Sequence, residues 1–173
     1  RAAVSAGLRV IAAEGRSAPD ASASGGASVS YYTPGSKDVL EDLLNRKHTL
    51  QPDALQKETR PFTVETFNDK YVLQDEMRTI ELYPISGNAY ATTLLMAYFP
   101  KERLLVEADV YTPPDPMSPR VPYFPYAQNL VDNIQTRNLK VDRVLPLHGR
   151  MVPFDDLVEA AKRPVPVAMG PPT

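Results

Sequence analysis

The sequence contains no cysteine and only two histidines among its 173 residues. Without cysteine the chain can form neither a disulfide bond nor a thiolate–metal bond, and cysteine usage indicates no cellular compartment. No run approaches the ~20 consecutive apolar residues that a membrane-spanning helix needs. The longest apolar stretch, TTLLMAYFP at 92–100, has the length of a strand. We therefore expect a soluble protein with no membrane partner, and both a cytoplasmic and a periplasmic location stay open.

Other familiar kinds of functional site are missing as well. The sequence has no Gly-x-Ser-x-Gly elbow, no persuasive Ser/His/Asp arrangement and no glycine-rich phosphate loop. The formal net charge of −2 at pH 7 offers none of the excess positive charge that binding to nucleic acid requires. The sequence thus gives no support for a serine hydrolase, a phosphate-loop enzyme or a partner made of nucleic acid.

What is present is the composition of an ordinary globular protein, with 43% hydrophobic and 23% charged residues. The chain is long enough to bury one core, so we expect a single domain over residues 1–163. The small polar stretch within 17–35 predicts a flexible loop, and 164–173 predicts a proline-rich tail. The chain opens with RAAVSAGLRVIAAEG, which resembles the interior of a domain, and we expect further residues upstream of Arg1.

Hydrophobic periodicity predicts a layered α/β protein. Predicted strands cover 8–13, 63–67, 70–74, 78–85, 94–99, 103–111 and 141–148, and predicted helices cover 36–47, 126–139 and 153–162. The helix over 36–47 has one apolar face, and the helix over 126–139 has three inward-facing residues: Val39, Leu40, Leu43 and Leu44 in the first, and Leu130, Val131 and Ile134 in the second. A tight connection is expected near Asp75 and Glu76, between two of the strands. Residues 48–61 have no strong period. A strand meander is therefore followed by strand, helix, strand and helix, which favours a sheet with helices on its outer face.

Two potential metal ligands end predicted strands. His148 follows the strand-like run VLPL and precedes Gly149, while Asp109 stands among apolar residues at the end of LLVEADVY. A carboxylate in such surroundings needs a partner, because burying it unpaired is costly. Zinc accepts imidazole and carboxylate ligands, but its sites usually take at least three from the protein. A hydrogen-bonded histidine, a capping aspartate and a plain turn glycine remain alternative interpretations.

The order of several motifs resembles the C-terminal part of a metallo-β-lactamase-fold hydrolase. The resemblance is carried by RAAVSAG with RVIAAEG, by ELYPISGNAYATTLLMAYFPKERLLVEADVYTPP and by VDRVLPLHGRMVPFDDL, and it covers about residues 1–16 and 37–160. It implies a metallo-β-lactamase-like α/β sheet with helices packed on its outer face, of the αββα type and truncated at the N-terminus.

The resemblance also implies a partial set of zinc ligands. Asp109 and His148 match the family's bridging aspartate and last histidine, and the implied cofactor is one or two zinc ions. The family's His-x-His-x-Asp-His segment does not occur in this sequence. Tyr90 stands where the family has another histidine, and a phenol with a pKa of ~10 is a poor zinc ligand.

Three residues near these motifs are candidates for binding substrate. Asn88 would stand near the pocket, Tyr90 would donate a hydrogen bond to a substrate carbonyl, and Arg150 would hold an anionic group. Turn chemistry for Asn88 and surface ion pairing of Arg150 with Asp155 or Asp156 are the structural alternatives.

Two functions follow from the resemblance. The first is a hydrolase in which metal-activated water attacks an ester, lactam, lactone or thioester carbonyl of a small-molecule substrate. The second is a degenerate, metal-free binding or scaffold module, which the missing histidine motif and Tyr90 favour. If half of the sandwich is absent, the exposed sheet face needs a cover, so we also expect a homodimer.

Overall fold

The computed structural model describes residues 4, 6–14, 37–47, 50–58, 61–88, 90–117 and 126–162. The predicted loop 17–35 and tail 164–173, as well as His48, lie outside the described residues. The chain divides into two compact units, one of Arg1–Val72 with Leu82–Leu95 and one of Leu73–Glu81 with Met96–Thr173. The expectation of a single domain over 1–163 stays a prediction.

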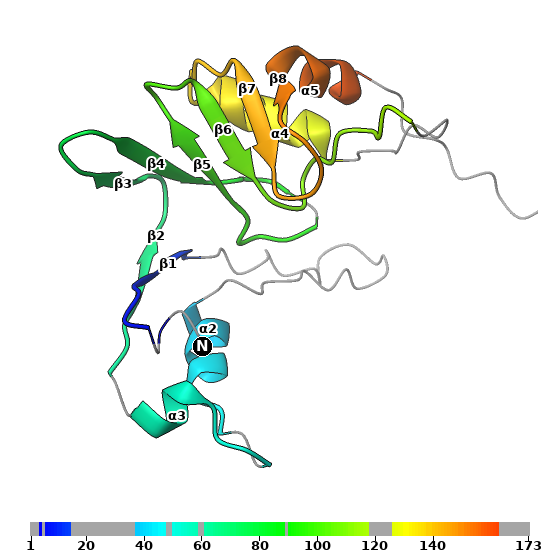
Figure 1. Cartoon of the computed structure of the whole chain (residues 1–173). Helices are drawn as coiled ribbons and strands as arrows, with labels where there is room; N and C mark the ends of the chain where they lie inside the picture. The colour runs from blue at the N-terminus through cyan, green and yellow to red at the C-terminus, as the bar shows by residue number, and fades with distance from the viewer. Residues whose placement is uncertain are drawn as a thin grey trace, which may run out of the picture. The chain divides into compact units, whose positions relative to one another are not determined.

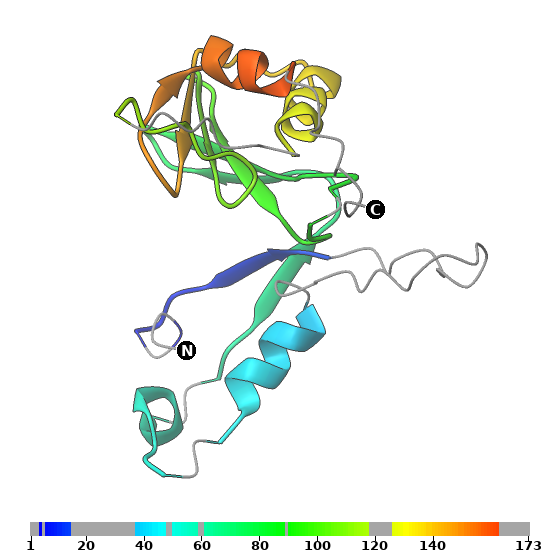
Figure 2. The same ribbon diagram turned by 90° about the vertical axis from the view of Figure 1, so that its right-hand side faces the viewer.

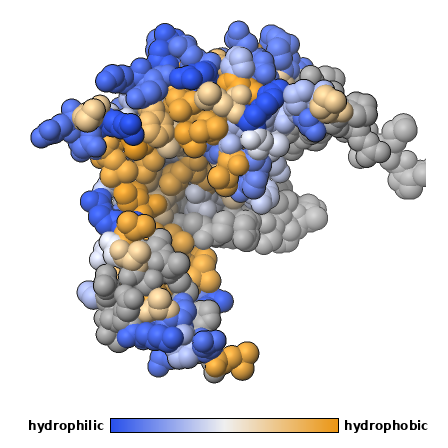
Figure 3. Space-filling model, in the orientation of Figure 1, coloured by the Kyte–Doolittle hydropathy of each residue, from blue (hydrophilic) through white to orange (hydrophobic). Residues whose placement is uncertain are grey.

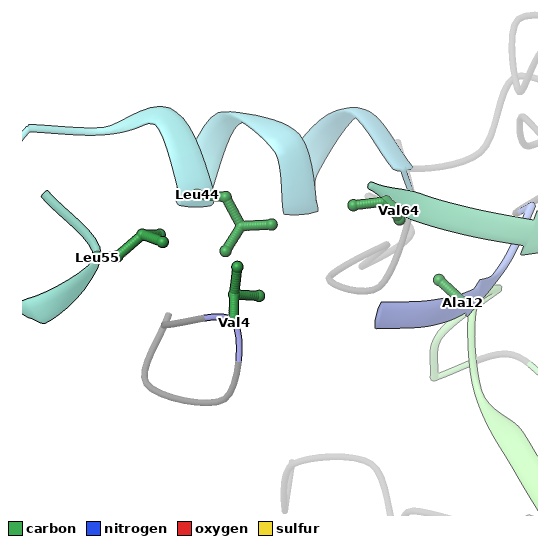
Figure 4. Packing of buried hydrophobic residues seen from close by; sticks show 5 residues of the cluster. All are labelled: Val4, Ala12, Leu44, Leu55 and Val64. Carbon is green, nitrogen blue, oxygen red and sulfur yellow. The ribbon is translucent and has the colours of Figure 1, made fainter. Parts of the chain in front are cut away.

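The first unit contains a small core between two helices and a pair of strands. Strand β1 (Val10–Ala13) pairs in parallel with β2 (Val64–Phe67), and α2 (Lys37–Asn45) and α3 (Ala54–Glu58) complete the core. The buried side chains of this core come from all four elements and from the turn before β1, as Figure 4 shows: Val4, Ala12, Leu44, Leu55 and Val64.

Helix α2 confirms the predicted helix but buries less of it than the pattern indicates. Of the predicted apolar face, Leu44 is buried and Leu40 packs against the core from a partly buried position. Val39 and Leu43 remain 37% and 42% exposed. The helical spacing of the apolar residues is as predicted, but the small core contacts only part of the face that they form.

Helix α3 was not predicted, because its five residues are too few to show a period. Its local signal is a cap: the side chain of Asp53 accepts a hydrogen bond from the backbone N–H of Gln56 at 3.0 Å. An aspartate followed three residues later by glutamine is a recognised way to begin a helix.

A six-stranded sheet forms the other main element of the fold, with the order β3-β4-β5-β6-β7-β8. Its strands are β3 (Tyr71–Gln74), β4 (Thr79–Pro84), β5 (Leu95–Phe99), β6 (Leu104–Glu107), β7 (Arg143–Pro146) and β8 (Val152–Pro153). Strands β5 and β6 are antiparallel, β6 and β7 are parallel, and β7 and β8 are antiparallel. Strand β8 was not predicted, and its Pro153 is tolerated because β8 is the last strand of the sheet.

The predicted tight connection between β3 and β4 is confirmed. The side chain of Asp75 accepts hydrogen bonds from the backbone N–H groups of Met77 and Arg78 at 2.8 and 2.7 Å. These two bonds, that of Met77 first, lower the pKa of the Asp75 carboxyl below its ordinary value. This is the turn chemistry in which a short carboxylate satisfies its own loop backbone.

Two helices cover one face of strands β6 to β8. Helix α4 (Ala127–Thr136) supplies the crossover between β6 and β7, and α5 (Phe154–Ala161) follows β8 directly; both lie together on one side of the sheet in Figures 1 and 2. The predicted inward residues of α4, Leu130, Val131 and Ile134, are all buried. This is the α/β sheet with helices on one face that the sequence predicts.

The two faces of β6 and β7 differ in burial. Leu105 and Val144, which face each other across the strands, are fully buried. On the alternate positions Val106 is half-buried and its partner Leu145 is 37% exposed. Figure 3 shows hydrophobic side chains gathered over the sheet in this view and polar ones along the edge above it. Among the described residues no helix combines the length and the apolar character needed to cross a bilayer.

The contrast between the two faces predicts unequal effects of truncation. Leu105→Ala removes a side chain with no exposed surface and should lower the free energy of unfolding by about 2–5 kcal/mol. Leu147→Ala, at a side chain that is 69% exposed, should change it by about 0.5 kcal/mol or less. Urea unfolding of both variants measures the difference, and equal effects would show that the burial pattern of this sheet is wrong.

Candidate functional site

The parallel pairing of β6 and β7 brings Asp109 and His148 together. In this pairing Glu107 lies opposite Pro146, the last residues of the two strands. The ladder continues one step further, because the N–H of Leu147 donates to the carbonyl of Glu107 at 2.8 Å. Asp109 and His148 each follow the end of their own strand by two residues. Equal spacing from one common edge therefore places the two side chains face to face.

The distance between the two side chains suits two kinds of contact. His148 Nε2 lies 3.2 Å from Asp109 Oδ1, which is an ion-pair distance when the imidazole is protonated. Two ligands of one tetrahedral zinc ion at ~2.0–2.2 Å would lie about 3.3–3.6 Å apart, which is close to that separation. The side chains are 65% and 46% exposed, and an ion pair this exposed contributes only ~0–1 kcal/mol to stability. Stability alone is therefore a weak reason for the pair.

Both strands end earlier than predicted. The sequence pattern carried them to residues 111 and 148, but the structure ends them at Glu107 and Pro146. For β6 the reason lies in the backbone of Asp109, which has φ of +67° and therefore leaves the extended conformation. The left-handed region costs an L-residue about 1 kcal/mol or more, and aspartate is one of the few residues that visit it. This turn leaves Asp109 partly exposed while Val110 and Tyr111 enter the core.

Gly149 has a conformation that a side chain would not allow. Its φ is +112°, and a Cβ atom at this position would lie 3.1 Å from Cδ and 3.2 Å from Cγ of Pro113. Both the backbone angle and the contact with the loop after β6 therefore favour glycine. The residue that follows His148 thus lets the two strand-end loops approach each other.

Glu107 is the site residue that sequence reasoning missed. It is 2% exposed, and its Oε2 accepts hydrogen bonds from the backbone N–H groups of Val110 and Tyr111 at 3.1 and 3.4 Å. Its Oε1 has no hydrogen-bond partner within the described part of the chain. The signal was available in the period of the strand, since Glu107 shares a face with the fully buried Leu105 two residues before it.

Burial changes the acidity of Glu107. Loss of hydration raises the pKa of its carboxyl to about 7, against the lowering effect of the two backbone N–H donors, and the charge of Asp109 raises it further. The folded state therefore favours the neutral acid between pH 4.5 and about 7, where an exposed glutamate is ionised.

The three predicted substrate-binding residues lie in different places. Asn88 is buried and its Oδ1 accepts the N–H of Tyr90 at 2.8 Å, a hydrogen bond typical of a turn. Tyr90 is 43% exposed, and both residues belong to the first unit, so a shared pocket with Asp109 stays a prediction. Arg150 is exposed after His148 and forms no ion pair with another described residue.

The described residues do not complete a metal site. Among them, no group of three or more histidine, cysteine, aspartate or glutamate side chains is arranged to hold a metal ion. Asp109 and His148 supply two donors, one fewer than a zinc site usually takes from the protein. The pair therefore accounts for part of a ligand set.

No family model matches the chain, and no curated protein matches it. Several solved structures do match the chain. A metallo-beta-lactamase from Pontibacter korlensis is 17% identical with a TM-score of 0.49, over 92% of this chain and 59% of that one. An archaeal metallo-beta-lactamase superfamily protein from Sulfolobus tokodaii is 15% identical with a TM-score of 0.47, over 95% of this chain and 64% of that one. The chain thus spans less than two thirds of the length of either protein, and both carry the name of the family that the sequence resembles.

The contact of Gly149 with Pro113 predicts a specific cost of adding one methyl group. Gly149→Ala should lower the free energy of unfolding by about 1–3 kcal/mol, because alanine disfavours a φ of +112° and its Cβ would press on the proline ring. Arg150→Ala, at the next exposed position, should change it by about 0.5 kcal/mol or less. Thermal unfolding of both variants checks this, and a neutral Gly149→Ala would contradict the loop geometry.

The raised pKa of Glu107 predicts a pH dependence of stability. The folded carboxyl titrates at about 7 and the unfolded one near the ordinary value of 4.5, so its contribution is full below pH 4.5. The contribution is lost as the pH rises toward 7, because the unfolded state releases its proton first, and the loss amounts to at most ~3 kcal/mol. Urea unfolding at pH 5 and pH 8, with a chelator present, should show a steeper decline for the natural protein than for Glu107→Gln. Equal declines would contradict the buried acid.

Proposed function

We propose that this chain is part of a metal-dependent hydrolase of the metallo-β-lactamase kind, with Asp109 and His148 as two ligands of its zinc site. The observation that carries the proposal is the 3.2 Å separation of His148 Nε2 and Asp109 Oδ1 at the carboxyl ends of two adjacent parallel strands. In open α/β sheets the carboxyl ends of the strands are the usual place for ligands.

The local backbone supports a functional role for this edge. Asp109 adopts a left-handed conformation, and Gly149 occupies a position closed to other residues by Pro113. Both features cost conformational free energy, while the exposed ion pair that they create contributes little to the stability of the folded state. Local costs of this kind concentrate at functional sites, where geometry matters more than stability.

The residues present have defined tasks in such a hydrolase. Zinc, when bound, lowers the pKa of a water molecule toward ~7 and polarises a carbonyl group. Asp109 contributes an anionic oxygen and His148 an imidazole nitrogen to its binding. Arg150 places an exposed positive charge two residues after His148, suited to an anionic group of a small ester, lactam, lactone or thioester. The remaining ligands would come from outside the described residues, either from further protein or from a second copy of the chain.

A metal-free binding or scaffold module is the second candidate function. It is favoured by the presence of only two donors in the described cluster and by Tyr90 in place of the family's histidine. In that case the 3.2 Å contact is an ion pair that joins two loops and nothing more.

Zinc titration distinguishes the two functions. A ligand that binds only the folded state raises its free energy of unfolding, by about 2.7 kcal/mol at a concentration of 100 times the Kd. We expect added zinc to raise the Tm of the natural protein, and expect Asp109→Ala and His148→Ala to lose most of that rise. Hydrolysis of chromogenic esters and lactams by the zinc-loaded protein then tests the reaction.

Matched controls are available within the chain. Asp132→Ala removes an exposed carboxylate that accepts a hydrogen bond from Gln128 on α4, and Asp142→Ala removes an exposed carboxylate that pairs with Arg103. Both should keep the zinc-dependent rise in Tm. No rise in the natural protein, together with no bound zinc by elemental analysis, would leave the metal-free module as the function.

A further inference from the structure

Glu107 stands out among the acidic residues of the chain. It is the only aspartate or glutamate among the described residues that is buried, at 2% exposure. Burying a carboxyl group is costly unless it gains specific hydrogen bonds, and a leucine or valine on this face of β6 would avoid that cost. Its contacts therefore indicate what the fold gains from it.

The contacts of Glu107 close a short loop around Asp109. Oε2 of Glu107 accepts the N–H of Val110 at 3.1 Å and that of Tyr111 at 3.4 Å. On the other side, the carbonyl of Glu107 accepts the N–H of Leu147 at 2.8 Å, one residue before His148. One residue thus holds the backbone after Asp109 through its side chain and the backbone before His148 through its main chain.

The loop needs this support because its backbone is unfavourable. Asp109 has φ of +67°, between the strand that ends at Glu107 and the two buried residues Val110 and Tyr111. Without this acceptor, the buried N–H of Val110 would be left unsatisfied and that of Tyr111 would lose its bond to the loop. The left-handed turn at Asp109 would then lose the hydrogen bonds that define its far end.

We propose that Glu107 is a positioning residue of this site, which accepts the Val110 and Tyr111 N–H groups and so holds Asp109 in the turn that presents its carboxylate to His148. The proposal rests on the function proposed above, since Asp109 is taken there as a zinc ligand. Partners behind a metal ligand commonly set its orientation, and losing one typically weakens metal affinity 10- to 100-fold.

The test measures zinc affinity by isothermal titration calorimetry in four variants beside the natural protein. Glu107→Ala removes the acceptor and should weaken zinc binding about 10- to 100-fold. Glu107→Gln keeps a carbonyl oxygen at the same reach and should restore the affinity to within about threefold. Asp109→Ala removes the proposed ligand itself and shows how much zinc affinity is lost without it. Leu105→Ala lowers stability from the same face of β6 without touching the loop and should leave the affinity of the folded protein within about threefold.

Amide hydrogen exchange of the metal-free protein supplies a second readout, independent of zinc. Exchange at Val110 and Tyr111 should accelerate about tenfold or more in Glu107→Ala and stay near the natural rate in Glu107→Gln. The ring signals of His148 in nuclear magnetic resonance spectra should move in Glu107→Ala toward their positions in Asp109→Ala.

The outcomes separate this inference from the proposed function. Natural zinc affinity in Glu107→Ala, with binding lost in Asp109→Ala, overturns the positioning role and leaves the zinc site intact. An affinity in Glu107→Gln as weak as in Glu107→Ala overturns it too, because hydrogen-bond acceptance would not be what matters. If the natural protein binds no zinc, the proposed function fails, and the exchange rates and His148 signals then decide whether Glu107 positions Asp109.

Discussion

The parallel pairing of β6 with β7, in the register that sets Glu107 opposite Pro146, is the constraint on which the rest of the site depends. Parallel strands cannot be joined by a tight turn, so this pairing requires a crossover, which α4 provides. A slip of one residue would exchange the two faces of a strand and separate the residues that follow it. The site is therefore determined by packing some distance away, where Leu130 and Ile134 hold the crossover helix in place.

Unfavourable local features collect at the edge that this register creates. Asp109 has a left-handed backbone, Gly149 stands in a position that a Cβ would crowd, and Glu107 buries a carboxyl group with one oxygen unpartnered among the described residues. Beneath them, Leu105 and Val144 are fully buried and in good strand geometry. The regular core thus offsets the cost of an irregular edge, a distribution expected where an edge is shaped for binding.

The sequence allowed the site to be predicted to the extent that strand ends could be recognised. Asp109 and His148 were found because each closes an apolar run, and the parallel order of the runs places such ends together. The register itself could not be predicted, because it depends on how α4 packs. Glu107 was not singled out, although its two-residue spacing from Leu105 along the strand places both on one face, which is the buried one.

The same reasoning explains the errors elsewhere in the fold. Helix α3 and strand β8 are too short for a period to show, and their signals are single residues, such as the cap at Asp53. The predicted end of β6 lies too far along the chain, because apolar residues continue after the extended backbone stops. Val110 and Tyr111 are buried, but they follow the turn at Asp109. Hydrophobic pattern reports burial, whereas a strand end is set by backbone angles and hydrogen bonds.

The geometry at this edge also bears on how a metal ion would act on the protein. Metal binding is coupled to folding when the ligands come together only with the ion. In this protein Asp109 and His148 lie 3.2 Å apart, at positions set by the strand register and by the loop that Glu107 closes. If the pair binds zinc as proposed, the fold rather than the ion would set the separation of these two side chains. The affinity of the complete site would then depend chiefly on how well the remaining ligands are brought to this edge.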